Sequence, residues 1–109
     1  TVNYPGASIE TDFAWAGKHP MVEGYKAYRK MPYDRPTWDL TSVLYSVEGP
    51  SYFNVSPAGK INVTDQGATE FTPDAAGNRY YLTVDSIQAE NIKQHFVQLL
   101  TKQPAHFNK

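Results

Sequence analysis

Apolar side chains recur at helical spacing in three separate stretches of the chain. In the first stretch, the residues that share one side of a helix are Met21, Val22, Tyr25 and Tyr28. Pro20 suits the first helical position, because its missing N–H costs little there. Pro32 disfavours helical geometry in the residue before it, so we expect this helix to end by Met31.

The other two helical stretches lie in the middle and at the end of the chain. The middle helix is predicted to start at Thr37, whose hydroxyl suits an N-cap, and to end at Gly49-Pro50. Its predicted buried stripe, at i, i+3, i+4 and i+7, is Leu40, Val43, Leu44 and Val47. The last helix is predicted to follow Asp85, with Gln88 as its capping-box partner. Its apolar stripe is Ile92, Phe96, Leu99 and Leu100, and the tail to Lys109 is expected to be loose.

Between these helices the pattern changes to alternation, which is typical of strands. Ile61 and Val63 fall on one face of an extended segment at 60–64. Asp65-Gln66-Gly67 fits a hairpin loop with glycine in the left-handed position, so residues 68–72 are expected to pair back. Residues 51–55 and 79–84 also suit strands, which together predicts a small antiparallel meander. The first 17 residues give no firm prediction beyond a strand or short helix around 7–14.

Composition narrows the classes of function. The chain has 109 residues, of which 40% are hydrophobic and 14% aromatic, which indicates one small domain or one piece of a larger protein. Its net charge of −1, without a basic stripe, argues against nucleic-acid binding. No apolar run is long enough to span a membrane. The absence of cysteine excludes disulfides and thiolate metal sites within the chain.

Asp39 is the first candidate for chemistry, because it lies in the first turn of the middle helix. An acidic side chain there is also favoured simply by the positive end of the helix dipole. The functional alternative is a ligand for a hard cation or an acceptor for a sugar hydroxyl. Trp38, directly before it, is either a core anchor or an aromatic surface on which a base or sugar stacks.

The histidines do not suggest a metal site. His19, His95 and His106 have no i, i+3 or i, i+4 spacing, so none is predicted to be catalytic. His19 is expected to help cap a helix, and His95 to lie at the surface or its boundary. A phosphate-binding glycine loop and a nucleophile elbow are both missing from the sequence.

Three ordered segments carry a resemblance to a known family. They are the runs HPMVEGYKAY (19–28), RPTWDLTSVLY (35–45) and YFNVSPAGKINV (52–63). Together they resemble the C-terminal region of the inosine–uridine-preferring nucleoside hydrolase family, in which bacterial members show a similar helix, a Pro-Ser/Thr-Trp-Asp helix start and a Tyr-Phe…Ser-Pro-x-Gly strand pair. The resemblance extends over about residues 19–84.

The resemblance implies a role for each residue of the Trp38-Asp39 pair. It implies that Asp39 binds the active-site Ca²⁺ and approaches the ribose, and is thereby the catalytic and substrate-binding residue. Many family members have histidine before this aspartate; here Trp38 replaces it, which favours stacking on the base over protonation of the base. The family's N-terminal aspartate cluster is missing, and Glu10 and Asp12 do not match it.

These observations predict an α+β segment with two helices, a small antiparallel β-meander and a C-terminal helix, packed on a Rossmann-like α/β core. Residues 1–109 are expected to form a single C-terminal segment of a larger enzyme that cleaves the N-glycosidic bond of nucleosides with calcium-activated water. The isolated chain is expected to be inactive. Its expected partners are a nucleoside and the N-terminal portion of the same protein or a companion chain.

Two alternatives stay open at this stage: a non-catalytic binding module and a catalytically inactive relative of the family. The sequence decides neither base preference nor whether the protein is a homo-oligomer. A cytoplasmic and a periplasmic location are both compatible with it.

Overall fold

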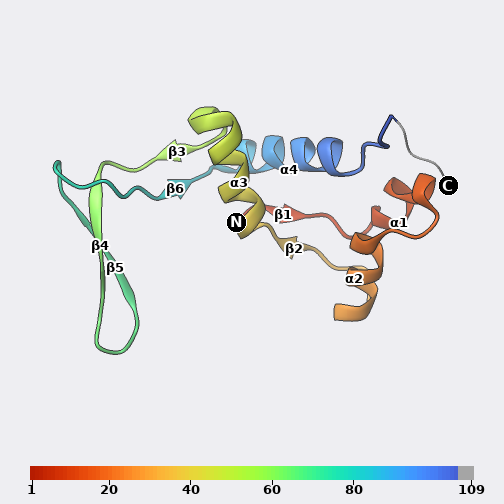
Figure 1. Cartoon of the computed structure of the whole chain (residues 1–109), viewed down its shortest axis with the longest axis horizontal. Helices are drawn as coiled ribbons and strands as arrows, with labels where there is room; N and C mark the ends of the chain where they lie inside the picture. The colour runs from red at the N-terminus through yellow and green to blue at the C-terminus, as the bar shows by residue number, and fades with distance from the viewer. Residues whose placement is uncertain (106–109) are drawn as a thin grey trace.

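A computed structural model shows a mixed α+β fold, as predicted, and describes residues 1–105 (Figure 1). Its helices are α1 (Ile9–Asp12), α2 (Pro20–Tyr28), α3 (Trp38–Glu48) and α4 (Ser86–Leu100), with 3-10 turns η1 (Ala14–Ala16) and η2 (Gly49–Tyr52). Its strands are β1 (Asn3–Tyr4), β2 (Arg35–Pro36), β3 (Asn54–Val55), β4 (Gly59–Val63), β5 (Thr69–Pro73) and β6 (Leu82–Thr83). The expectations for His106 and for the tail to Lys109 fall outside the described residues.

The strands are antiparallel, as expected, but they form three separate two-stranded ladders instead of one meander. The hairpin of β4 and β5 was predicted, and Gly67 in its loop has the expected left-handed φ of 83°. The following strand is only two residues long and pairs with β3, not with β5. Among the described residues, backbone bridging between the segment before β6 and the hairpin is limited to one bridge, between Gly59 and Arg79. The hairpin therefore extends from the rest of the chain without a third strand.

The molecule is elongated. Its principal extents are 52 × 31 × 26 Å and its radius of gyration is 17.5 Å, whereas a compact domain of this length has about 13 Å. Its accessible surface is 7863 Å², compared with about 6,100 Å² for a monomer of this mass. Both differences show that the chain buries less of its own surface than a self-contained domain does.

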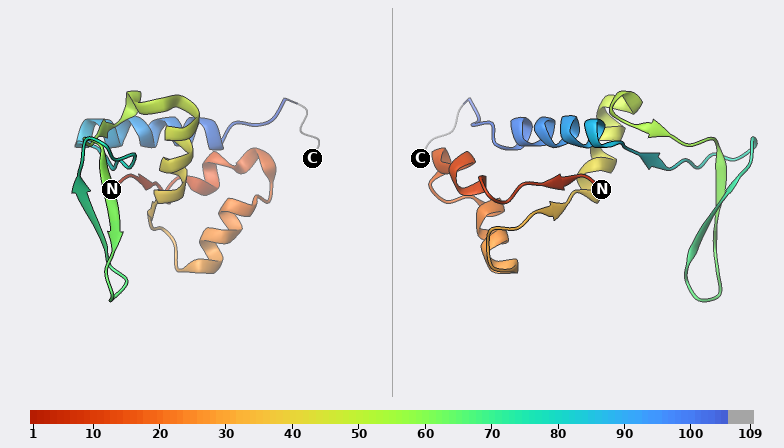
Figure 2. Two further views of the ribbon diagram at one scale, coloured as in Figure 1. Left: turned by 60° about the vertical axis from the view of Figure 1, so that its left-hand side comes forward. Right: turned by 180° about the vertical axis from the view of Figure 1, so that it is seen from behind.

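The core is small, and the segment that the sequence pattern left undecided supplies a substantial part of it. Its buried apolar residues are Val2, Tyr4, Ile9, Phe13, Val22, Tyr25, Leu44, Phe53, Ile92 and Phe96. The first four of these precede α2. In Figures 1 and 2, β1 runs beside α4 and pairs with β2 on its other side. The N-terminal segment is therefore the central layer of the fold.

Helix α2 begins and ends as the sequence predicts. The side chain of His19 is its N-cap, because Nδ1 accepts a hydrogen bond from the Met21 N–H at 3.1 Å. His19 also stacks on Phe13, with ring centroids 4.1 Å apart. The expected role of His19 as a helix cap is thereby confirmed.

The predicted buried stripe of α3 is half exposed. Leu44 is 5% exposed, but Val43 is 58% and Val47 is 77% exposed. The reason is that α4 covers only one side of α3, and on α4 itself Leu99 is 53% exposed. Between the two helices lies a cavity of about 170 Å³, which we call the α3–α4 groove. Its lining residues are Leu40, Val43, Leu44, Val47, Glu48, Phe96, Leu99 and Leu100.

His95 joins α4 to the end of α3. Its Nε2 lies 2.9 Å from Glu48 Oε2, and its ring stacks on Tyr52 with centroids 5.1 Å apart. The side chain is 20% exposed, so His95 lies at the boundary, as expected. Within the described residues, Nε2 makes no hydrogen bond of good geometry, so its contact with Glu48 is a close approach of the two side chains.

The start of α4 is the predicted capping box. The Gln88 N–H donates to Asp85 Oδ1 at 2.7 Å, and the Asp85 N–H donates to Gln88 Oε1 at 2.9 Å. Asp85→Ala removes the acceptor, so we expect it to lower the free energy of unfolding by about 1 kcal/mol. Chemical denaturation followed by circular dichroism measures this loss. Asp85→Ser keeps a hydrogen-bond acceptor and should therefore retain most of the wild-type free energy of unfolding. Equal losses in the two variants would show that the Asp85 side chain does not stabilise α4 as a cap.

Candidate functional site at the head of helix α3

Trp38 and Asp39 are the first two residues of α3, and the backbone before them is firmly held. The Thr37 N–H and hydroxyl both donate to the carbonyl oxygen of Val2, each at 2.9 Å. Thr37 was predicted to cap α3 with its hydroxyl, but this side chain makes no cap hydrogen bond. Thr37 is 4% exposed, and its hydroxyl connects the helix start to Val2, the residue before β1. The buried Val2 carbonyl requires such a donor. The site therefore sits on a fixed helix start.

The carboxylate of Asp39 is accessible. Asp39 is exposed, and within residues 1–105 no cation or hydrogen-bond donor is paired with it. Arg35 lines a small cavity together with Asp39. Its guanidinium, however, lies over the Tyr28 ring, 4.2 Å from the centroid. Asp39 thus keeps its oxygens free for a cation or for hydroxyl groups.

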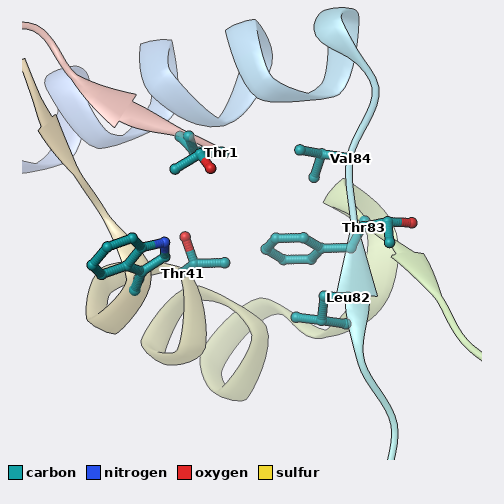
Figure 3. Close-up of a pocket in the computed structure, with 8 residues that line it drawn as sticks. Thr1, Thr41, Leu82, Thr83 and Val84 are labelled. Carbon is teal, nitrogen blue, oxygen red and sulfur yellow. The ribbon is translucent and has the colours of Figure 1, made fainter. Parts of the chain in front are cut away.

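Trp38 separates two cavities and is 72% exposed. The larger, of about 430 Å³, is bordered by Thr1, Val2, Trp38, Thr41, Phe53, Leu82, Thr83 and Val84. Figure 3 shows Thr41 of α3 facing Leu82 and Val84 across this cavity, with Thr1 above. The smaller cavity, of about 240 Å³, is on the side of Asp39. The larger cavity falls within the size range of small-molecule sites.

The side of the smaller cavity formed by α2 is aromatic and uncharged. Burial, with Tyr33 and Asp34 nearby, raises the pKa of Tyr25, whose hydroxyl donates to the Tyr4 carbonyl at 3.4 Å. Burial, followed by Asp12 and Tyr25, raises the pKa of Tyr4 to about 12. Both phenols are therefore neutral at physiological pH, so neither is a general base. Among the described residues, Asp39 is left as the only carboxylate that lines this cavity.

The acidic and histidine side chains of residues 1–105 do not gather into a metal site. No group of three such residues is placed to hold an ion within that range. Ca²⁺ takes six to eight oxygen ligands, about 2.3–2.6 Å away. Asp39 suits one of them, because it is a hard oxygen donor, exposed and unpaired on a rigid element. The other ligands would have to come from outside the described residues.

No family model, curated protein or solved structure matches the chain. The assignment to nucleoside hydrolases consequently rests on the residue runs quoted above and is a proposal. Within the described part of the chain, none of the helices has the length and apolar character that crossing a membrane requires.

The sequence predicted Trp38 and Asp39 as neighbours, and the structure places both at an exposed helix start. The sequence did not predict that Tyr25 and Arg35 line a cavity with Asp39. These residues come from α2 and β2, and no regular spacing relates them to α3. Long-range pairing of β2 with β1 brings them together, which local patterns do not show.

Proposed function

We propose that the chain is the C-terminal segment of a calcium-dependent hydrolase that cleaves the N-glycosidic bond of nucleosides. Asp39 supplies one oxygen ligand of the calcium site and contacts the ribose hydroxyls. Trp38 stacks on the base. The observation that supports this proposal best is the Asp39 carboxylate itself, which is exposed, has no partner among residues 1–105, and stands at the start of α3 beside an exposed indole.

The chemistry suits these two side chains. The reaction displaces the base at the anomeric carbon through an oxocarbenium-like transition state, as in glycoside cleavage. A bound calcium ion would lower the pKa of the attacking water and orient it. Asp39 holds its position without rearranging, because β1 and Thr37 fix the backbone before it. Trp38 offers an apolar face to a departing base, since most of its indole is free of contacts.

The remainder of the enzyme needs a surface on which to pack, and the α3–α4 groove suits it. Seven of the eight residues that line this groove are apolar. Val43, Val47 and Leu99 are exposed there, although Leu44 and Phe96 in the same groove are buried. A Rossmann-like core, from the N-terminal portion of the same protein or a companion chain, would cover them and bring the missing ligands toward Asp39. Without that core the chain is expected to be inactive, since it contributes one calcium ligand of several.

A non-catalytic binding module is the second candidate, and one observation favours it. The cavity of about 430 Å³ beside Trp38 combines apolar walls with the hydroxyl of Thr41, which suits a small aromatic ligand (Figure 3). This candidate and an inactive hydrolase relative share one expectation: the protein would bind a nucleoside and release it unchanged.

Calcium removal tests the proposal. We expect the full-length protein to hydrolyse inosine or uridine to ribose and base. Chelation of calcium with EGTA should abolish turnover, because the nucleophilic water is then no longer activated, and excess Ca²⁺ should restore it. Chromatographic separation of base from nucleoside measures the reaction, and calorimetry with Ca²⁺ measures binding. Turnover that persists in EGTA would refute the calcium mechanism, and nucleoside binding without turnover would favour the binding module.

A further inference from the structure

A further cavity adjoins the one beside Asp39, and Arg35 belongs to both. This further cavity, of about 220 Å³, is lined by Met21, Gly24, Tyr25, Tyr28, Tyr33 and Arg35, and we call it the tyrosine cavity. Met21, Tyr25 and Arg35 also line the cavity beside Asp39, so the two cavities adjoin at these residues. A ligand that contacts Asp39 therefore needs only a short extension to reach Arg35 and the tyrosine cavity.

The charge at the tyrosine cavity is positive. Arg35 is the one charged residue among the described residues that line it. Its guanidinium lies over the Tyr28 ring, 4.2 Å from the centroid. A second guanidinium, that of Arg29, lies over the ring of Tyr33, another lining residue, 5.2 Å from the centroid. Neither arginine forms an ion pair within residues 1–105, so both charges are available to an anion.

Two carboxylates are near Arg35, and neither is paired with it. Asp34 precedes it in the sequence, but its Oδ1 accepts a hydrogen bond from the Gly6 N–H at 3.0 Å. Asp39 lines a cavity with Arg35, yet the two side chains form no ion pair. An arginine that stabilised the fold through its charge would pair with one of these carboxylates, because guanidinium and carboxylate match as bidentate partners. The N–H donors of Arg35 thus need an acceptor from outside the described residues.

We propose that the substrate carries a phosphate on the 5′-oxygen of its ribose and that Arg35 binds this phosphate. It rests on the proposed function, in which Trp38 stacks on the base and Asp39 contacts the ribose hydroxyls. The neighbouring 2′- and 3′-hydroxyls suit Asp39 and calcium, which leaves the 5′-oxygen to carry the anionic group. A phosphate monoester has a charge of about −1.5 to −2 at pH 7 and accepts bidentate hydrogen bonds from arginine. The substrate class is accordingly that of nucleoside 5′-monophosphates, and unphosphorylated nucleosides bind less tightly.

One short segment, residues 35–39, supplies all three contacts. Arg35 pairs with Tyr4 in the ladder of β1 and β2, which holds its backbone. The Thr37 hydroxyl donates to the Val2 carbonyl, which holds the peptide before Trp38. Groups for phosphate, base and ribose are therefore fixed to the same strand, so little order is lost when a ligand binds them together.

Arg35→Gln in the full-length protein tests the inference, and Arg79→Gln is the matched control. Each variant removes the charge of an exposed arginine, but Arg79 bridges to Gly59 at β4 and lines neither cavity. Calorimetry in the presence of Ca²⁺ compares uridine, uridine 5′-monophosphate and uridine 3′-monophosphate. We expect the wild-type protein to bind the 5′-monophosphate about 10-fold or more tighter than uridine, as hydrogen bonds to a charged group provide. The 3′-monophosphate should gain nothing.

Arg35→Gln should remove most of this preference and leave the affinity for uridine unchanged, whereas Arg79→Gln should keep the preference. If uridine is hydrolysed but its 5′-monophosphate binds no more tightly, or if Arg35→Gln keeps the preference, the phosphate site is overturned and the hydrolase proposal stands. If the 5′-monophosphate binds through Arg35 but neither compound is hydrolysed, the phosphate site stands and the hydrolase proposal fails. Binding of neither compound would overturn both.

Discussion

Asp39→Asn in the full-length protein is expected to reduce nucleoside hydrolysis by more than about 100-fold. Loss of an outer-shell partner already costs 10–100-fold in metal affinity or activity, and Asp39 is proposed as a direct ligand. The amide of asparagine has nearly the same shape but no negative charge. Calcium affinity should therefore fall together with kcat, while the fold stays intact, because Asp39 is exposed and unpaired within the described residues.

Asp65→Asn is the matched control for this variant. Asp65 is also exposed, but it lies in the loop between β4 and β5, away from the cavity beside Asp39. We expect Asp65→Asn to keep wild-type turnover and wild-type calcium binding by calorimetry. If Asp39→Asn retained both properties as well, Asp39 would simply be a residue that stabilises the start of α3.

Ile92→Ala should produce the largest loss of stability, about 2–5 kcal/mol in the free energy of unfolding. Ile92 is 0% exposed and packs in the small core beneath β1. Its truncation leaves a cavity that few neighbours can fill, because the core contains only ten buried apolar residues within positions 1–105. Urea denaturation, with the slope held common to both proteins, gives the difference.

Ile87→Ala makes the same chemical change on the same helix. Ile87 is 73% exposed, and alanine is the better helix former, so this variant should differ from wild type by no more than about 0.5 kcal/mol. A loss of similar size in both variants would show that α4 packs differently from the arrangement described above.

The local features of the fold could be predicted from the sequence. The His19 cap, the Asp85–Gln88 capping box and the Gly67 turn each depend on residues within a few positions of one another. Strand β1 could not be predicted, because it is two residues long and owes its position to a partner more than thirty residues away. The same is true of Thr37, whose hydroxyl pairs with Val2 in preference to the helix that it precedes.

Prediction of the candidate site was limited in a similar way. The Trp38-Asp39 pair is visible in the sequence because both residues lie next to a recognisable helix start. Exposure of Val43 and Val47 was not predicted, since a helical apolar stripe indicates that a face will be covered but not which element covers it. In this chain the covering surface is incomplete, and the prediction of a buried stripe was therefore wrong for half of its residues.

The double hydrogen bond from Thr37 to the Val2 carbonyl has a mechanical consequence. It spans 35 positions in the sequence and couples the first strand directly to the peptide before Trp38. Strand β1 lies between α4 and β2, so this connection holds the start of α3 against the centre of the fold. A force that pulls β1 along its axis would therefore act directly on the peptide that precedes Trp38 and Asp39.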